Sequence, residues 1–586
     1  MVPYRSQTGA LRRSSRRRFL AGSAGLTGAA AFLAACGGGN NNKTASNSGN
    51  AGNSGAAKPA ASAAGSSAAQ ASSPGAAAAT QTPKKGGRIS QLAAITTQTL
   101  NPVTNWNEGT ILSGVSIYDR LVSTRLNKDS ATEYVPEAAA SVEQPDPTTV
   151  IFKLRPGMKY HDHDPVNGRA VVADDIVQTE NYIKDNPASQ DKSFQTLSMD
   201  SVTAPDDQTV SFKLKAPNAY LFSGTQLSYP AGGSIIIPKE TLNNLDQGWQ
   251  VGSGPYQLAN FQMNVNYLYK RFDGYHGASQ GPPYIDEREW KIIVDAAAQE
   301  SAFRSEQVQI WAPPIPQTAD TVKKDLGAKI NMNDYLSLSM VTLSFNVAKP
   351  PWNDPRVRQA MYRFTNRQQY LDLIESGRGQ IPAGLLSVGL KDYQLDASQT
   401  AKYWANDLKQ AKQLLDAAGY DYNHQVEMST IDGPRNNQGM QIFQQQAAQV
   451  GMKVQITPMQ FAEWLNQKIL TGNWEAWYSQ HPAYDSPHIY LRLQATNTYS
   501  VHKYNGLKDP AIDAMIEKAE QTLDHAARVQ LVKDIQIALL DKYTPFFITH
   551  NYTAYVANYK YVMDFEVNPA STAEPTYETQ MWLNKA

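Results

Sequence analysis

The chain has 586 residues, of which 18% are charged and 10% aromatic, and its 53 basic and 53 acidic residues give a formal net charge of zero. A chain of this length requires more than one domain or lobe. A neutral charge gives no electrostatic reason to bind nucleic acid. Cys36 is the only cysteine, so an internal disulfide or a cysteine-based metal cluster cannot form.

Residues 1–35 have the features of a bacterial export signal. Ser-Arg-Arg-Arg-Phe-Leu at 15–20 matches the twin-arginine pattern, and the apolar run that follows is too short and too weakly apolar for a confident membrane span. The run ends in Leu-Ala-Ala-Cys at 33–36, which is typical of a lipoprotein signal. The alternatives are an ordinary basic n-region, or a buried cysteine in an unusual N-terminus. We expect residues 1–35 to be removed and Cys36 to become the lipidated first residue, anchored at the outer face of the cell membrane.

Residues 36–86 form the next segment. From Gly37 to Gly86 there is no Val, Ile, Leu, Met, Phe, Tyr or Trp, and no acidic residue. Such a segment cannot bury enough apolar surface to offset its ordering entropy, so we predict a disordered tether. Loss of the six arginines in residues 1–35 would leave the mature chain with an excess of about six acidic groups.

The folded part is expected to begin near Gly87 and contains an internal repeat at an offset of 60 residues. Ser141–Leu154 and Ser201–Leu214 share a Pro-Asp turn followed by Thr-Val-x-Phe-Lys-Leu. The alternation of Val, Phe and Leu predicts a half-buried strand in each copy. We expect two similar hairpins in one lobe.

Helical patterns dominate the second half. Pro355 follows a capping Asp354 and opens one helix, and Asn406 is expected to cap another that ends at Gly419. Two further helices are predicted from apolar stripes at Ile512, Ile516, Ala519 and Leu523, and at Val532, Ile535 and Leu539. Phe546–Ile548 is expected to be a buried strand. The mixture of strands and helices favours an α/β or α+β body.

Several stretches in a fixed order resemble the family 5 extracellular solute-binding proteins of ABC importers, which include oligopeptide- and dipeptide-binding proteins. They are Val-Pro-Glu-Ala-Ala at 135–139, Pro-Asp at 145–146, Val-Ile-Phe-Lys-Leu-Arg-Pro-Gly at 150–157, Tyr-His-Asp at 160–162, Ala-Asp-Asp-Ile-Val at 173–177, Val-Gly-Ser-Gly-Pro-Tyr at 251–256, Ser-Phe-Asn at 344–346, Trp-Asn-Asp-Pro-Arg-Val-Arg-Gln-Ala at 352–360 and Ala-Lys-Gln-Leu-Leu-Asp-Ala-Ala-Gly-Tyr at 411–420. The resemblance runs from about Gly87 to the C-terminus.

This resemblance implies an α/β fold of the two-lobe periplasmic-binding-protein type (type II, cluster C-like), with an extra subdomain and a hinge between the lobes. Lobe I would comprise residues 87–338, including a small β-rich subdomain. Lobe II would comprise residues 339–544, and residues 545–586 would return to lobe I. The chain would cross between lobes near 335–346 and 544–551, and hinge closure would enclose a ligand.

The candidate ligand-binding residues follow from the same resemblance and from local aromatic and polar clustering. They are Trp106, Asn107, Glu108, Trp311, Trp477, His481, Tyr484, Asp485 and Tyr504. Peptide-binding relatives carry an aspartate four positions before Pro487 that pairs with the α-ammonium group of the peptide, whereas this chain has Ala483. A buried ammonium would be left without its partner there. Asp485 or Glu108 is a possible substitute.

The implied function is that of a substrate-binding receptor that captures a small polar solute, peptide or peptide-like, and delivers it to the permease subunits of an ABC transporter. Oligosaccharide or opine binding is an alternative, as is a sensor or adhesin with the same fold. A secreted carbohydrate hydrolase is an alternative from another class. We expect no catalytic residue, no cofactor, no metal at the His-Asp-His-Asp stretch 161–164, and a monomer.

Overall fold

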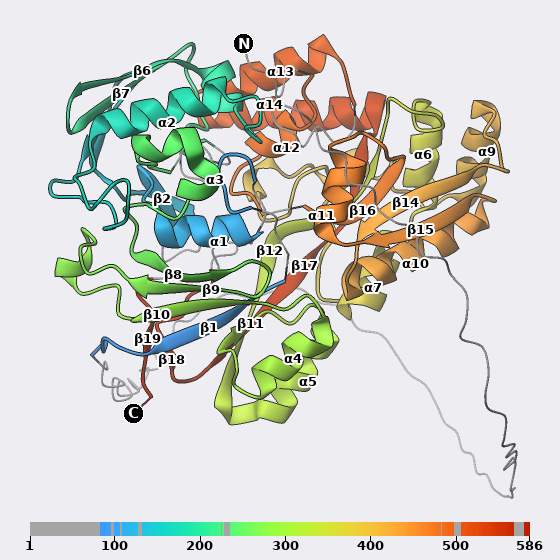
Figure 1. Cartoon of the computed structure of the whole chain (residues 1–586). Coiled ribbons are helices and arrows are strands. Elements are labelled where there is room, and N and C mark those ends of the chain that lie inside the picture. Colours follow the sequence, from blue (N-terminus) through green and yellow to red (C-terminus); the bar gives the residue numbers. More distant parts are fainter. Residues whose placement is uncertain are drawn as a thin grey trace, which may run out of the picture. The chain divides into compact units, whose positions relative to one another are not determined.

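In the computed structural model, one mixed sheet of 11 strands runs through the protein (Figure 1). Ten strands follow the order β15 (Lys453–Met459), β14 (Gln425–Ile431), β16 (Ala476–His481), β12 (Ile330–Phe345), β17 (Phe546–Tyr559), β11 (Ile310–Trp311), β1 (Arg88–Ala93), β10 (Glu287–Ile292), β9 (Asn266–Arg271) and β8 (Tyr256–Gln262). The eleventh, β13 (Gly379–Gln380), pairs with β17. Strands β14, β15 and β16 are mutually parallel, as are β1, β10 and β11.

The structure describes residues 82–94, 99–105, 108–126, 132–223, 226–227, 235–481, 483–496, 506–567 and 579–585. All of them belong to one compact unit, Thr80–Ala586. The α-helices are α1 (Glu108–Ile117), α2 (Ala173–Asp185), α3 (Leu245–Gly248), α4 (Ala296–Arg304), α5 (Pro316–Leu326), α6 (Pro355–Phe364), α7 (Arg367–Glu375), α8 (Ala397–Thr400), α9 (Leu408–Ala418), α10 (Pro434–Gln449), α11 (Phe461–Trp464), α12 (His488–Arg492), α13 (Pro510–Gln521) and α14 (His525–Ala538). Short 3-10 or π-helical turns lie at Phe194–Ser198, Lys239–Asn244, Ala278–Gln280, Gly327–Lys329, Lys391–Tyr393, Leu465–Ile469 and Leu539–Tyr543.

Strands β12 and β17 connect the two halves of the sheet and lie side by side in the middle of the molecule (Figure 1). They pair from Ile330 to Ser344, but the register shifts between Leu336 and Met340. The sequence places a passage between lobes at this interruption. A second register shift lies between Val341 and Thr342, and such irregularities bend and twist a strand locally.

The internal repeat forms a separate four-stranded sheet, so the prediction of two similar hairpins is confirmed. Its order is β4 (Ala139–Asp146), β5 (Thr149–Leu154), β7 (Thr209–Leu214) and β6 (Met199–Asp206). The two repeated strands pair with each other, and the rings of Phe152 and Phe212 meet edge to face at 5.7 Å. Two-stranded sheets are formed by β2 (Val122–Leu126) with β3 (Thr132–Pro136), and by β18 (Val562–Met563) with β19 (Trp582–Leu583).

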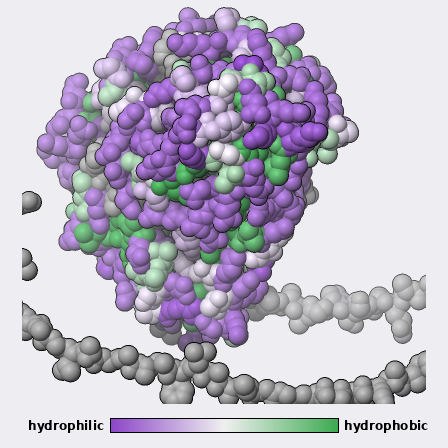
Figure 2. Space-filling model, turned by 90° about the vertical axis from the view of Figure 1, so that its right-hand side faces the viewer, coloured by the Kyte–Doolittle hydropathy of each residue, from purple (hydrophilic) through white to green (hydrophobic). Residues whose placement is uncertain are grey.

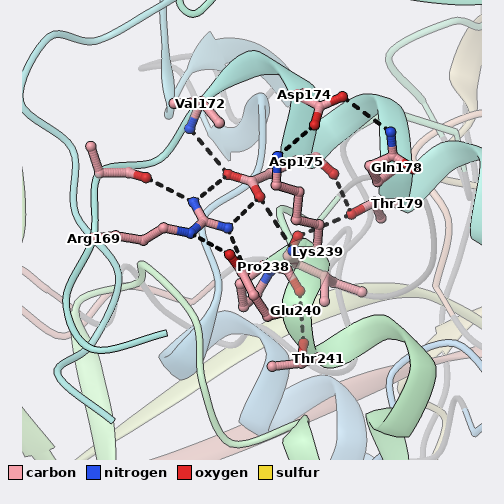
Figure 3. A network of polar contacts seen from close by, with 12 residues as sticks. Arg169, Val172, Asp174, Asp175, Gln178, Thr179, Pro238, Lys239, Glu240 and Thr241 are labelled. Atoms are coloured by element: carbon pink, nitrogen blue, oxygen red, sulfur yellow. Dashed lines mark hydrogen bonds and ion pairs between the residues drawn. The ribbon is translucent and has the colours of Figure 1, made fainter. Parts of the chain in front are cut away.

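The Asp174-Asp175 pair at the start of α2 anchors this helix to the rest of the subdomain (Figure 3). Asp175 is fully buried and accepts two hydrogen bonds from the Arg169 guanidinium, at 2.9 and 2.6 Å. It also accepts from the backbone N–H groups of Val172 and Lys239, at 3.1 and 3.2 Å. Lys239 in turn donates to Asp174 at 2.7 Å. The motif therefore has a structural role: it caps α2 and ties it to the segment that follows Pro238.

The helices of the second half form where the sequence predicts them, with two corrections. Asp354 caps α6, Gly419 ends α9 in the left-handed conformation, and the stripe of α14 is buried. However, α9 is capped by Asp407, whose side chain accepts from Gln410 N at 2.9 Å, because Asn406 has a positive φ of 48°. Leu523 lies beyond the end of α13 and is 47% exposed, so it does not extend that apolar stripe.

The face of the molecule that includes α10 and β15 is mostly hydrophilic, and its apolar residues form separate patches (Figure 2). No helix among the described residues combines the length and the hydrophobicity needed to cross a bilayer.

Candidate functional site: the cavity between strand ends

A cavity of about 280 Å³ lies where the carboxyl ends of the two sets of parallel strands face each other. One wall contains Ala94, Val294 and Pro314, which follow β1, β10 and β11. The opposite wall contains Ile431 at the end of β14 and residues 432–436 after it, Gln460 and Phe461 after β15, and Gln480 of β16. In α/β sheets, ligands bind in the crevice outside the carboxyl ends of the strands. The volume is close to the lower end of small-molecule sites, roughly 300 to 1,000 Å³.

Polar groups in this cavity are mainly side-chain amides. Gln299, Asn436, Gln460 and Gln480 all line it. An amide can both donate and accept a hydrogen bond. Two of the four are already engaged: Gln299 Nε2 donates to Ile293 O at 2.7 Å while its Oε1 accepts from Trp311 Nε1, and Asn436 Nδ2 donates to Ile431 O at 2.8 Å. Apolar contact comes from residues such as Val294, Ile431 and Phe461, and Asp432 and Arg435 add one charge of each sign to the lining. The cavity therefore suits a polar solute with some apolar surface.

Trp477, a predicted ligand residue, lies behind the cavity wall. It is 1% exposed and packs in a cluster with Trp464 and Trp474, its ring meeting that of Trp464 at 5.6 Å. Ile431 and Phe461, which line the cavity, pack against this cluster. Trp477 therefore supports the wall from behind and is separated from the cavity by these two side chains.

His481, at the end of β16, is also buried. It is 6% exposed, its ring lies 5.5 Å from that of Trp477, and its carbonyl accepts from the Ser339 hydroxyl. The Ser339 contact ties the end of β16 to β12, which continues into the other half of the sheet.

Tyr484 and Asp485 lie just beyond β16, where the small subdomain meets the second half of the chain. The Tyr484 ring packs on Tyr490 at 5.1 Å. Asp485 Oδ2 accepts from the hydroxyl of Tyr134 on β3 at 2.9 Å. Burial and the Asp485 carboxylate raise the pKa of Tyr134, so its hydroxyl remains a donor. Asp485 thus bonds across the two halves of the molecule.

Trp311 is 3% exposed in the core beneath the first wall. Its indole N–H donates to Gln299 Oε1 at 3.3 Å, and Gln299 lines the cavity. This contact orients the Gln299 amide. Trp106, Asn107, Tyr504 and Cys36 lie outside the described residues, and Glu108 begins α1 but its side chain is outside them as well.

A buried ionic group that the sequence does not reveal lies behind the second wall. The Glu375 carboxylate, fully buried at the end of α7, accepts from Arg435 Nε and Nη2 at 2.6 and 3.2 Å and from His550 Nε2 at 3.2 Å. Burial alone would raise the pKa of Glu375, but the charge of Arg435 and the bonds from both partners outweigh it and lower the pKa. The Arg435 guanidinium also stacks on Tyr552 at 3.9 Å. These partners are 60 and 175 residues from Glu375 in the sequence, so no local pattern could have identified them.

The His-Asp-His-Asp stretch is part of the scaffold. His161 is 1% exposed; its Nε2 lies 3.1 Å from Gly254 O, and its Nδ1 accepts from Gly252 N at 3.4 Å. Burial lowers the pKa of His161 to about 4, so the ring is neutral. A Cβ at Gly252 would lie 2.1 Å from Ile117 O, which explains the glycine turn. In the described part of the chain, no group of three or more His, Cys, Asp or Glu side chains could hold a metal ion.

The fold with these facing strand ends is that of type II periplasmic binding proteins, which hold a solute between two halves. The sequence profile of the bacterial extracellular solute-binding proteins, family 5 Middle, matches residues 133–501. The match covers more than half of the chain, and the chain therefore belongs to the family 5 extracellular solute-binding proteins. It has the role of a substrate-binding receptor.

Individual relatives agree with this assignment. The dipeptide-binding protein of Escherichia coli (strain K12) is 26% identical over 497 residues, which is 78% of this chain and 88% of that protein. The periplasmic binding protein DppA from Helicobacter pylori in complex with peptide STSA superposes with a TM-score of 0.76 at 21% identity, covering 86% of this chain and 99% of that chain. AgaA from A. tumefaciens R10 in complex with agropinic acid superposes with a TM-score of 0.72 at 23% identity, covering 83% and 96%.

Proposed function

We propose that the protein captures a peptide or peptide-like solute in the cavity between the strand ends and delivers it to the permease of an ABC importer. The observation that carries this proposal is the position and lining of the cavity: four side-chain amides and an apolar wall at the carboxyl ends of both sets of parallel strands. Peptide groups offer the donors and acceptors that such amides match. The dipeptide-binding relative supports the same class of solute.

Capture would involve closure of two lobes, residues 87–338 with 545–586 and residues 339–544. The proposed boundary at residue 338 coincides with the register shift between Leu336 and Met340 in the β12–β17 ladder. Tyr134 and Asp485 would join the lobes in the closed state, and Trp311, Trp477, His481 and Tyr484 would support or border the bound solute. Trp106, Asn107, Glu108 and Tyr504 are proposed as further contacts.

Delivery at the membrane would depend on the N-terminal segments. The export signal (1–35), the lipid on Cys36 and the tether (36–86) would keep a monomeric receptor near the permease. A receptor of this kind predicts no turnover of the solute.

An opine or oligosaccharide is the second candidate, because of Ala483. This residue is 6% exposed and provides no charge where peptide-binding relatives have an aspartate. An opine has carboxylate and secondary-amine groups and does not need the same partner for a free α-ammonium.

A thermal-shift screen of the mature protein over peptides, opines and oligosaccharides tests the proposal. A ligand that binds only the folded state stabilises it by about 2.7 kcal/mol at a concentration of 100 Kd. We expect at least one peptide-like solute to raise Tm and to be recovered unchanged. Hydrolysis products, or a shift with oligosaccharides alone, would contradict the proposal. Asp485→Ala tests the interlobe contact separately.

A further inference from the structure

A second contact between the proposed lobes lies away from the cavity, where the segment 218–227 meets α12, α13 and α14. Leu221 and Leu227 belong to the apolar core of the repeated strands, whereas the three helices belong to another core, and the two cores share no residue. Polar groups join the two sides: Ala219 N, for example, donates to Glu520 O at 2.8 Å. Interfaces between domains resemble transient protein–protein interfaces and are more polar than permanent ones.

The backbone fixes the orientation of two side-chain amides in this segment. Tyr220 N donates to Asn218 Oδ1 at 2.9 Å, so Asn218 Nδ2 faces Gln226 and donates to its Oε1 at 2.8 Å. Gln226 Nε2 therefore points across the interface, where it lies 3.0 Å from His488 Nε2. An amide nitrogen can only donate. For this hydrogen bond, His488 Nε2 has to accept and cannot carry a proton of its own.

His488 also has a partner within the second half of the chain, and this partner makes the opposite demand. His488 Nε2 lies 3.0 Å from Glu520 Oε1, and the Glu520 carboxylate also accepts from Nε and Nη2 of Arg492. Burial alone would raise the pKa of Glu520, but the bonds and charges of His488 and Arg492 outweigh it and lower the pKa. Glu520 is thus an ionised acceptor. A proton on Nε2 bonds to Glu520, whereas a lone pair on Nε2 bonds to Gln226, and one atom cannot do both.

The remaining groups around His488 do not remove this conflict. The side chain is 5% exposed, and the Tyr220 ring packs on it at 5.4 Å. Burial raises the pKa of Tyr220, so this ring stays neutral. Arg528 lies over the same ring at 5.5 Å, and with the arginine of α12 it disfavours a further positive charge, which Glu520 favours. All these charged groups belong to lobe II and stay beside His488 when the lobes separate, whereas the Gln226 amide leaves with lobe I.

We propose that His488 couples closure of the lobes to its own protonation. With the lobes apart, Nε2 carries a proton and donates to Glu520. When Gln226 docks, a neutral ring moves this proton to Nδ1, but a cationic ring must release it to solvent. Acid therefore opposes closure and weakens solute binding. Gln226 and His488 do not line the cavity and act on affinity as positioning residues. The inference rests on the proposed function and adds regulation to it.

The first test measures Kd by calorimetry at pH 7 and pH 5, with the mature protein and a peptide found in the screen, for example Ala-Leu. Histidine side chains change charge in this range, whereas the terminal groups of a peptide ordinarily titrate outside it. Release of one proton on closure raises Kd by up to about tenfold per pH unit. We expect the wild-type Kd to rise at least about fivefold. If no peptide-like solute binds at either pH, the proposed function itself fails.

His488→Gln is the matched variant. Its amide can donate to Glu520 and accept from Gln226 at either pH, so we expect its Kd to change by less than about twofold. The same pH dependence in wild type and in His488→Gln would overturn the inference while the proposed function stands.

Gln226→Glu should reverse the sign of the effect. A carboxylate at this position still accepts from Asn218 but also accepts from a protonated Nε2, so its Kd should be lower at pH 5 than at pH 7. Gln208→Glu adds the same charge at an exposed position between β6 and β7, and it should behave as wild type. A wild-type increase of Kd in Gln226→Glu would contradict the inference.

Proton counting on the wild-type protein decides the case if the variants do not fold. Calorimetry at pH 6 in two buffers of different ionisation enthalpy gives the number of protons released per solute bound. We expect a net release of up to about one proton. Binding without release, or with proton uptake, would overturn the inference.

Discussion

Glu180 allows a quantitative prediction about stability and pH. It lies in α2, is fully buried in the small subdomain, and its Oε2 accepts from Gln195 Nε2 at 2.7 Å. Oε1 has no partner among the described residues. Burial raises the pKa of Glu180 from 4.5 to about 8, and the bond from Gln195 offsets this only in part. The folded protein thus keeps this side chain protonated at neutral pH, whereas the unfolded chain does not.

The sign and size of the effect follow from proton linkage. Between pH 4.5 and about 8, the folded state holds one proton more than the unfolded state at this site, so stability falls as pH rises. Below pH 4.5 both states are protonated and the penalty is absent. The slope is about 1.36 kcal/mol per pH unit, which gives a loss on the order of 3 kcal/mol between about pH 5.5 and about pH 8.5.

Glu180→Gln has the same shape and no charge, so it should lack this slope. Urea unfolding of wild type and variant at both pH values gives four free energies of unfolding. The difference in free energy of unfolding between variant and wild type should rise by about 3 kcal/mol in favour of the variant from the lower to the higher pH. Asp185→Asn, an exposed carboxylate on the same helix, is the control and should run parallel to wild type. A difference for Glu180→Gln within about 0.5 kcal/mol of zero would refute the reasoning.

Three further predictions concern binding, stability and anchoring. Tyr134→Phe removes the hydrogen bond between β3 and Asp485, which we propose to act in closure, and should weaken solute binding about fivefold without a comparable change in Tm; calorimetry that gives an unchanged Kd would exclude that role. Glu375→Gln leaves the buried Arg435 without its anionic partner and should lower the free energy of unfolding by about 3 kcal/mol, measured in urea at pH 7; a loss under about 1 kcal/mol would contradict the importance of the pair. Cys36→Ser should release the protein from the membrane fraction and remove an acyl chain from its intact mass, and wild type that carries no lipid would disprove the anchor.

The sequence predicted the scaffold well because its elements depend on local patterns. Alternation of Val, Phe and Leu produced the paired strands β5 and β7, and Pro355 after Asp354 produced the start of α6. The cap of α9 was misplaced by one residue, since Asn and Asp both suit that position and only the backbone decides between them. Leu523 was misassigned because the apolar spacing continues past the point where the helix ends.

The candidate site was harder to predict. The aromatic side chains near β16 border the candidate cavity from behind, and Trp477 and Trp311 are nearly fully buried. A cluster of aromatic and polar residues in the sequence does not show whether each side chain faces the cavity or the core. The Glu375–Arg435 pair joins residues 60 positions apart. The start of α10 has Gly433 at its N-cap and no side-chain hydrogen bond to its first turn. Such features exist only in three dimensions.

The family motifs themselves explain why the fold is easier to predict than the solute. Asp175 caps α2 and binds Arg169, while His161 contacts the glycine turn at Gly252. These motifs stabilise the scaffold, and none of those residues lines the cavity. The cavity instead is lined by residues such as Arg435 and Gln480, outside the recognised stretches. Since scaffold and lining are separate sets of residues, the lining can change its polarity while the scaffold motifs stay intact, and the solute must be inferred from the donors and acceptors of the lining alone.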